Sequence, residues 1–172
     1  MFRTMLAATD GSDHARKAVA LAADLADKYG ARLVILHVLM HGEPPEELKR
    51  MAEIEHLVDP PPPSPPPAAV PGPVPVPAGE GRSATSYRVL EAIGRRIVAA
   101  AEAEARAKGV REVTTRIDDG DVATRILACA EAEGAGMIVL GSRGLGDLQG
   151  LLMGSVSHKV GQLAPVTCIT VK

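Results

Sequence analysis

The sequence has very few aromatic residues: no tryptophan, one phenylalanine (Phe2) and two tyrosines (Tyr29 and Tyr87) among 172 residues. Proteins that bind single-stranded nucleic acid without sequence preference stack the bases on aromatic side chains. The formal net charge of -2 also provides no positive field for a phosphate backbone or an anionic membrane surface. We therefore expect no nucleic-acid partner.

Long hydrophobic runs are absent as well, because charged residues or glycines interrupt every apolar stretch. A membrane-spanning helix needs roughly 20 consecutive apolar residues. Residues 1–6 lead directly into a strand pattern and lack the charged region, apolar stretch and cleavage site of an export signal. The sequence therefore predicts a cytoplasmic protein without a membrane span.

Cysteine is scarce, with only Cys129 in a helix pattern and Cys168 in a strand pattern. In a reducing compartment such residues are small core side chains rather than a disulfide or a metal site. Metal-site spacing is also absent from the histidines, which we expect to be solvated or structural: His14, His37, His41, His56 and His158.

The hydrophobic residues that are present, mainly alanine, valine, leucine and isoleucine, form strand and helix patterns in alternation. Helices are expected between Ser12 and Gly30, over about 86–108, from Asp121, and for about ten residues from Gly154 until Pro165 ends the pattern. The last helix is expected to point Val156, Val160 and Leu163 inward. Strands are predicted at residues 4–9, 33–38, 113–117, 137–140 and 166–171.

Most of these strands are apolar on both faces, which indicates a parallel sheet covered by helices on each side. In the third strand, residues 113–117, apolar residues alternate with polar ones, and we place this strand at an edge of the sheet. The expected fold is α/β, a single doubly wound five-stranded parallel sheet with helices on both faces, of the Rossmann-like kind. We expect residues 1–172 to form one domain.

An insertion interrupts this pattern after the second strand, at about residues 41–83. Its centre, 59–77, is dominated by proline, which favours polyproline II or disorder, and residues 46–57 have the spacing of a short amphipathic helix. Two interpretations remain open. The segment is either a surface insertion or a docking segment for an unknown proline-binding protein partner.

Two loops are expected at the carboxyl ends of the strands, where doubly wound sheets bind ligands. Residues 9–12 follow the first strand, and the glycine-rich residues 141–150 follow the fourth; the loops face one another if these strands are neighbours. Gly154 and Ser155 then open the last helix, whose amides and dipole favour an anion. From the residues alone, this loop is either a phosphate site or a flexible turn before a capped helix.

The spacing Gly141-x2-Gly144-x9-Gly154-Ser155 resembles the ATP-binding signature of the universal stress protein family. The resemblance extends over the whole chain except residues 41–83. It implies that Ala8, Thr9 and Asp10 border the adenosine and ribose, that Val38 contacts the adenine through its backbone, and that the glycine loop and last helix hold the phosphates. The complete expected set is Ala8, Thr9, Asp10, Val38, Leu140, Gly141, Arg143, Gly144, Gly154, Ser155, Val156 and Ser157.

Asp10 has two physical interpretations. A carboxylate at a strand end can bond a ribose hydroxyl or help to hold a phosphate-bound Mg²⁺. It can instead form a turn by accepting a bond from its own backbone. The expected cofactors are ATP and Mg²⁺, with no metal site formed by the protein alone.

The resemblance implies an ATP-binding stress-response regulatory protein that binds nucleotide without rapid turnover. It is not expected to be an enzyme, although slow hydrolysis is compatible with it, because the sequence contains no Walker lysine motif or nucleophile elbow. One alternative is an ATP-pyrophosphatase-like adenylating enzyme. Residues 9–13 faintly resemble the loop that such enzymes place after their first strand. Another is a scaffold with a vestigial nucleotide site.

A homodimer is also expected. The last strand, at 166–171, is apolar and lies last in the chain, so its backbone groups are expected at an open sheet edge. Pairing with a second copy would cover that edge, and the family resemblance implies the same contact.

Overall fold

The computed structural model describes residues 2–39, 84–144 and 153–172. Contacts divide the chain into two compact units, Met1–Met40 with Gly94–Lys172, and His41–Ile93. Of the second unit only the beginning of one helix is described, so the predicted insertion and its short helix lie outside the described residues. The single domain expected from the sequence stays a prediction.

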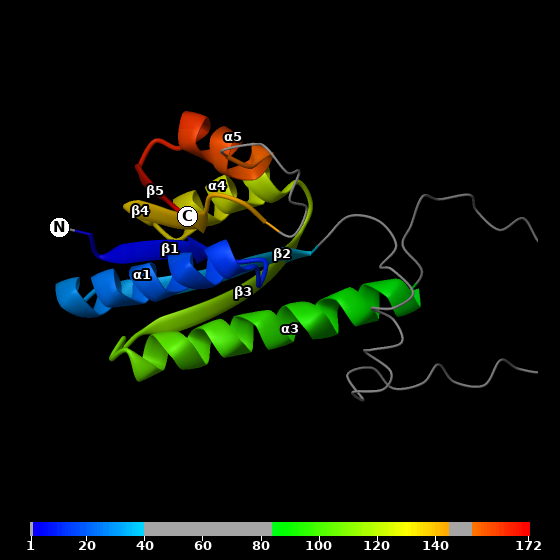
Figure 1. Cartoon of the computed structure of the whole chain (residues 1–172), viewed down its shortest axis with the longest axis horizontal. Helices are drawn as coiled ribbons and strands as arrows, with labels where there is room; N and C mark the ends of the chain where they lie inside the picture. The colour runs from blue at the N-terminus through cyan, green and yellow to red at the C-terminus, as the bar shows by residue number, and fades with distance from the viewer. Residues whose placement is uncertain (1, 40–83, 145–152) are drawn as a thin grey trace, which may run out of the picture. The chain divides into compact units, whose positions relative to one another are not determined.

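Five parallel strands form one sheet in the order β3-β2-β1-β4-β5 (Figure 1). The strands are β1 (Thr4–Ala8), β2 (Arg32–Leu39), β3 (Val113–Asp119), β4 (Met137–Gly141) and β5 (Thr167–Val171). The order runs one way from β1 to β3 and the other way from β1 to β5, which is doubly wound topology. The predicted fold class is confirmed, including the edge positions of β3 and β5.

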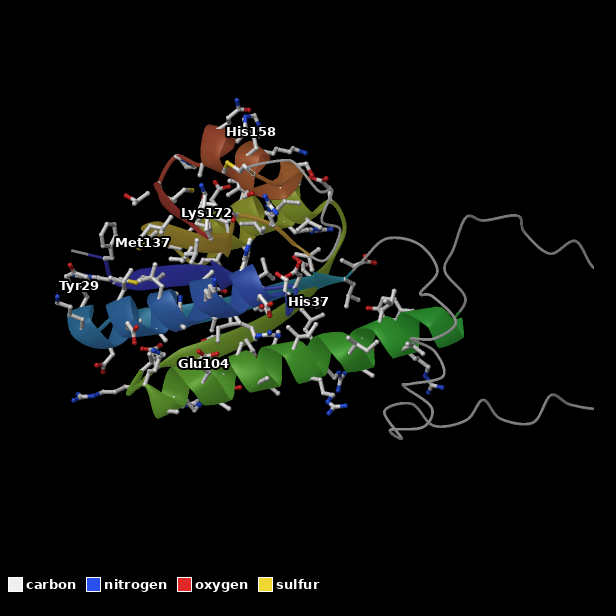
Figure 2. All side chains as sticks on the ribbon, viewed as in Figure 1. Tyr29, His37, Glu104, Met137, His158 and Lys172 are labelled. Atoms are coloured by element: carbon white, nitrogen blue, oxygen red, sulfur yellow. The ribbon has the colours of Figure 1, made fainter. Side chains whose placement is uncertain are left out.

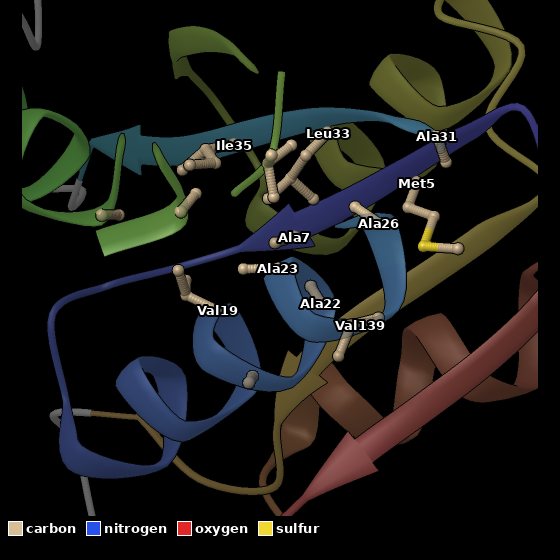
Figure 3. Close-up of a cluster of buried hydrophobic side chains, with 14 of the residues drawn as sticks. Met5, Ala7, Val19, Ala22, Ala23, Ala26, Ala31, Leu33, Ile35 and Val139 are labelled. Carbon is tan, nitrogen blue, oxygen red and sulfur yellow. The ribbon is translucent and has the colours of Figure 1, made fainter. Parts of the chain in front are cut away.

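The helices are α1 (Asp13–Tyr29), α3 (Ala84–Ala107), α4 (Val122–Ala132) and α5 (Ser155–Leu163). One face of the sheet packs against α1 and the residues of α3 from Gly94 onward, and the other packs against α4 and α5. None of the helices in the described ranges is long and apolar enough to cross a membrane. Figure 3 shows the cluster of buried side chains on the face that α1 covers. Its members include Met5, Ala7, Val19, Ala22, Ala26, Leu33 and Val139.

The ends of α1 follow directly from its terminal residues. The Ser12 side chain accepts a hydrogen bond from the Ala15 amide at 3.3 Å, and Gly30 adopts the left-handed conformation at φ 61. Ser12 and Gly30 therefore cap the helix that the sequence predicts between them. Alanines on the inner face of α1 are fully buried, which brings the helix backbone close to the sheet.

The inner face of α5 differs from the prediction at one position. Val160 is fully buried and Val156 is half-buried, but Leu163 is 58% exposed, so its predicted inward orientation is wrong. Leu163 is the last residue of α5, and the chain then turns into the edge strand β5. Among the described elements, none lies beyond β5 to cover this end of the helix.

Both cysteines are free thiols that pack in or against the α4/α5 cluster, with Cys129 buried and Cys168 half-buried. Burial raises the pKa of each thiol above its ordinary value. The predicted core placement is therefore confirmed for Cys129.

Glu133, at the end of α4, joins two strands through an ion-pair cluster. Its carboxyl, whose side chain is only 7% exposed, accepts a bond from Arg32 at 2.8 Å and also pairs with Arg116. Burial alone would raise the pKa of this carboxyl, but the bonds from Arg32 and Arg116 outweigh burial and lower the pKa. The carboxylate therefore stabilises the fold above its unfolded pKa, and that contribution is lost as pH falls through the lower folded pKa.

Glu133→Gln is expected to reduce the free energy of unfolding at neutral pH by about 1–2 kcal/mol, because the charge-assisted bonds to both arginines are weakened. Urea unfolding at neutral and acidic pH measures this. The variant should also lose less stability than the wild type on acidification. Glu112→Gln is the control, since Glu112 is exposed and lies 3.9 Å from Arg32. Equal stability losses in the two variants would contradict the expectation.

Candidate functional site

The carboxyl ends of β1 and β4 lie side by side, with Ala8 paired to Leu140 in the sheet register. The condition under which the two loops face one another, that the first and fourth strands are neighbours, is therefore met. The loops that follow are bonded to each other, because the Ser12 hydroxyl donates to the Arg143 carbonyl at 3.4 Å. The switch point of the sheet thus brings together the two predicted ligand loops.

The β1–α1 loop is shaped by its own side chains. The Gly11 amide donates to the Thr9 hydroxyl oxygen at 3.2 Å, and the Ser12 amide donates to Asp10 Oδ1 at 3.0 Å. Gly11 has φ 82, a left-handed conformation that favours glycine. The turn-forming interpretation of Asp10 is therefore observed for one carboxylate oxygen.

The second oxygen of Asp10 faces the other loop. A Cβ atom placed on Gly144 would lie 2.5 Å from Asp10 Oδ2. Any side chain at position 144 would displace this carboxylate. The absence of a side chain at Gly144 therefore leaves the space between the two loops that the Asp10 carboxylate occupies.

Ser142 bonds the end of β4 to both β5 and α5. Its amide donates to the Val171 carbonyl at 2.6 Å, and its carbonyl accepts from the Gly154 amide at 2.7 Å. The same carbonyl accepts a hydrogen bond from the buried Ser157 hydroxyl at 3.0 Å. The Ser157 hydroxyl also lies 3.0 Å from the Gly154 carbonyl oxygen. Sequence reasoning missed Ser142, and its place between the signature glycines was the available signal.

The Ser157 hydroxyl is thus engaged with backbone carbonyls at the start of α5. Ser155 and Val156 precede it in the first turn of the helix. The first amides of a helix have no partner within the helix, so those of α5 remain suited to an anion. Residues 145–152 of the predicted loop lie outside the described residues.

Gly154 precedes α5 with φ -71 and ψ 157, an extended conformation that any residue adopts. This turn therefore does not need the conformational freedom of glycine. The constraint is steric instead, because a Cβ atom at position 154 would lie 3.3 Å from the Ser142 carbonyl oxygen. Its own amide already bonds that carbonyl, so Gly154 does not offer this amide to a ligand.

Gly141 has a closer steric constraint. A Cβ atom there would lie 2.8 Å from the Ala15 nitrogen and 2.8 Å from the His14 carbonyl carbon. These backbone atoms belong to the first turn of α1. Gly141 therefore lets α1 approach the end of β4, which sets the distance between the two loops.

The described histidines near the site have structural contacts. His14 Nδ1 lies 3.2 Å from the Ser142 hydroxyl, and the buried His37 Nδ1 lies 2.8 Å from the Thr9 carbonyl. Ser142 is only 2% exposed, so its hydroxyl has little room to act as a nucleophile on a substrate. Among the residues that the structure describes, no cluster of three or more potential metal ligands is present.

The remaining predicted site residues lie along the same edge of the sheet. Val38, near the end of β2, and Leu140, near the end of β4, are buried, and Ala8 is half-buried. The described members of the predicted set therefore come from the ends of β1, β2 and β4 and from the start of α5. This arrangement fits a ligand with one apolar end and one anionic end.

The family model described as "Universal stress protein family" matches residues 1–60 and 56–172. Universal stress protein YxiE of Bacillus subtilis (strain 168) is 34% identical over 174 residues, covering 100% of both chains.

Two solved structures share the fold. A universal stress protein in complex with cAMP has a TM-score of 0.65 and 21% identity, covering 99% of this chain and 97% of that one. The universal stress protein from Archaeoglobus fulgidus in complex with dAMP has a TM-score of 0.60 and 16% identity, covering 100% and 98%. With its matching family model, its full-length relative and its doubly wound sheet, the chain belongs to the universal stress protein family.

Proposed function

We propose that this protein is a cytoplasmic regulatory protein of the stress response that binds ATP together with Mg²⁺ and does not turn it over rapidly. The observation that carries the proposal is the position of the Asp10 carboxylate between the β1–α1 loop and Gly144, at the switch point of the sheet. Family relatives have been solved with cAMP and dAMP, which supports an adenine nucleotide as the ligand class.

Different residues along this edge of the sheet would contact different parts of the nucleotide. The backbone at Val38 would meet the adenine, and the Asp10 carboxylate would bond the ribose or share the metal. The amides of Ser155, Val156 and Ser157 would bond the phosphates, because the helix dipole favours negative charge there. Arg143 would add positive charge.

The donor set fits a metal that arrives with the nucleotide. Mg²⁺ usually keeps several waters and binds through one or two carboxylates plus substrate phosphates. Asp10 is the carboxylate between the loops, and no complete metal cluster occurs in the described ranges. When bound, Mg²⁺ would neutralise part of the triphosphate charge.

Two measurements test this proposal. Mass spectrometry of the supernatant from heat-denatured purified protein identifies the nucleotide that the protein carries. Isothermal titration with ATP, with and without Mg²⁺, should give tighter binding with the metal. Equal affinities would contradict the metal part, and no ATP binding in either condition would contradict the whole proposal.

The nearly complete burial of Ser142 argues against a serine nucleophile at this site, because the hydroxyl beside His14 has little access to a substrate. A pyrophosphate-release assay over amino-acid and other carboxylic-acid substrates tests the adenylating alternative. Release at a rate typical of enzymes would contradict the regulatory proposal.

A homodimer through β5 is expected. β5 is an edge strand, and the exposed Leu163 precedes it at the end of α5. Pairing of two copies would satisfy the edge and cover this apolar side chain. Sedimentation at micromolar concentration should give a dimer for the wild type and weaker association for Leu163→Glu. Tyr29→Glu, another exposed apolar position, is the control, and a monomeric wild type with and without ATP would contradict the expectation.

A further inference from the structure

Two residues of α3, Gly94 and Ile97, lie against the part of the proposed nucleotide site that comes from β1 and β2. They are three residues apart, so they share one face of the helix. A Cβ atom on Gly94 would lie 2.8 Å from His37 Cδ2, and a Cβ atom on Gly11 would lie 3.3 Å from Ile97 Cδ1. Ile97 on this face of α3 therefore lies beside Gly11. Gly94 lies beside His37, which in turn contacts Thr9.

His37 connects α3 to Thr9. Figure 2 labels His37 at the end of β2 near α3, and this residue is buried, with an exposed fraction of 5%. His37 Nδ1 lies 2.8 Å from the Thr9 carbonyl oxygen. Because a carbonyl oxygen only accepts, Nδ1 donates the proton of this bond.

Thr9 is consequently bonded on both sides. Its amide donates to the Leu36 carbonyl at 2.9 Å, and its carbonyl accepts from His37. Thr9 O belongs to the same peptide group as the Asp10 amide, so the His37 bond sets the plane in which the Asp10 side chain begins. Burial lowers the pKa of His37, partly offset by the Thr9 bond and the Asp10 charge, so the ring is neutral at pH 7.

We infer that His37, together with the Gly94 and Ile97 face of α3, positions residues 9–11 for nucleotide binding, so that the docking of α3 and the binding of nucleotide are coupled. The inference rests on the proposed function, and it assigns to His37 and α3 a role in affinity. None of these three residues is required to touch the ligand. Coupling of this kind is reciprocal, so bound nucleotide stabilises the docked position of α3.

The closing test compares two substitutions at His37. The side-chain amide of His37→Asn places a donor near the position of Nδ1, whereas His37→Leu fills the apolar space without a donor. Isothermal titration with Mg²⁺ and ATP should give an affinity loss of roughly fivefold for His37→Leu, the value of one hydrogen bond, and under about twofold for His37→Asn.

Stability separates positioning from a merely structural role. His37→Leu leaves the buried Thr9 carbonyl oxygen unpaired, whereas His37→Asn keeps that bond but buries its own side-chain oxygen, so the two variants should have similar free energies of unfolding. Their affinities for nucleotide should differ nevertheless. Equal affinities, or affinity losses that simply follow the losses of stability, would overturn the inference.

A second pair of variants tests the helix itself. Ile97→Ala removes the contact with Gly11 and should raise the dissociation constant. Val98→Ala is the matched control, because Val98 is buried on the same helix and packs in the core cluster. It should lower stability without changing affinity. If Val98→Ala weakens binding as much as Ile97→Ala does, the effect is general and the inference fails.

Amide NMR spectra of the nucleotide-free variants keep this inference separate from the proposed function. The amide signals of Asp10 and Gly11 should shift in His37→Leu and Ile97→Ala but hardly in His37→Asn and Val98→Ala. A wild type that binds no adenine nucleotide would contradict the proposed function and with it the coupling to binding. Normal nucleotide binding with unshifted Asp10 and Gly11 signals would contradict the inference alone.

Discussion

Gly154→Val is expected to weaken ATP binding by about tenfold or more while the protein remains folded, the equivalent of losing one or two charge-assisted hydrogen bonds. A Cβ atom at this position would lie 3.3 Å from the Ser142 oxygen and 3.7 Å from Arg143 Cα. The added methyl groups of valine would push the start of α5 away from the β4 loop. The bond from the Gly154 amide to Ser142, at 2.7 Å, would lengthen.

The fold should survive because the backbone at Gly154 is extended, a conformation that suits valine. The core residue Val160 is untouched. Circular dichroism checks the fold, and fluorescence titration with an ATP analogue measures the affinity.

Gly161→Val is the matched control for this substitution. Gly161 lies on the same helix and is exposed, and among the described residues a Cβ atom there would come near Met153 alone, at 3.9 Å from its Cε. Its affinity should equal that of the wild type. Unchanged affinity in a folded Gly154→Val protein would mean that the glycine signature only forms a turn, and the nucleotide proposal would lose its main support.

Much of the fold could be predicted from the sequence because the deciding interactions are local. Ser12 caps the helix that starts one residue later, and Gly30 ends it by a left-handed conformation that glycine favours. The alternation in β3 indicated an edge strand, since a central strand would be apolar on both faces. The adjacent positions of β1 and β4 could not be predicted in this way, because doubly wound sheets also occur with another strand beside the first.

The site was predictable only where the sequence motif carried it. The bonds of Ser142 to Val171 and Gly154 use backbone atoms, which leave no pattern in the side chains. The contact of His37 with Thr9 joins neighbouring strands, and histidine within an apolar strand gives no sign of its partner. Leu163 has the spacing of a core residue, but the helix ends there, and periodicity does not show what covers a helix end.

The signature glycines also differ in their physical reasons, which spacing alone does not reveal. Gly144 leaves room for the Asp10 carboxylate, whereas Gly141 leaves room for the backbone of α1. A carboxylate can rotate away from a new methyl group. The backbone of a helix packed on the sheet moves only with the whole helix, so position 141 should tolerate an added side chain less well than position 144.

Gly141→Ala is accordingly expected to lower the free energy of unfolding by about 3 kcal/mol, at the upper end of the usual cost of overpacking. The new Cβ atom would lie 2.8 Å from both the Ala15 nitrogen and the His14 carbonyl carbon, and 3.0 Å from His14 Cβ. Since φ at Gly141 lies outside the left-handed region, backbone strain contributes nothing to this cost. Urea unfolding followed by circular dichroism measures the loss.

Gly30→Ala provides the complementary control. Its φ of 61 is left-handed, and no other part of the described chain lies within 4 Å of the added Cβ atom, so its cost is conformational, about 1 kcal/mol. The difference between the two variants therefore isolates the steric term between α1 and β4. A loss at position 141 no larger than at position 30 would mean that α1 shifts easily on the sheet. In that case Gly141 would not set the distance between the two loops, and nucleotide affinity should then be unchanged in the variant.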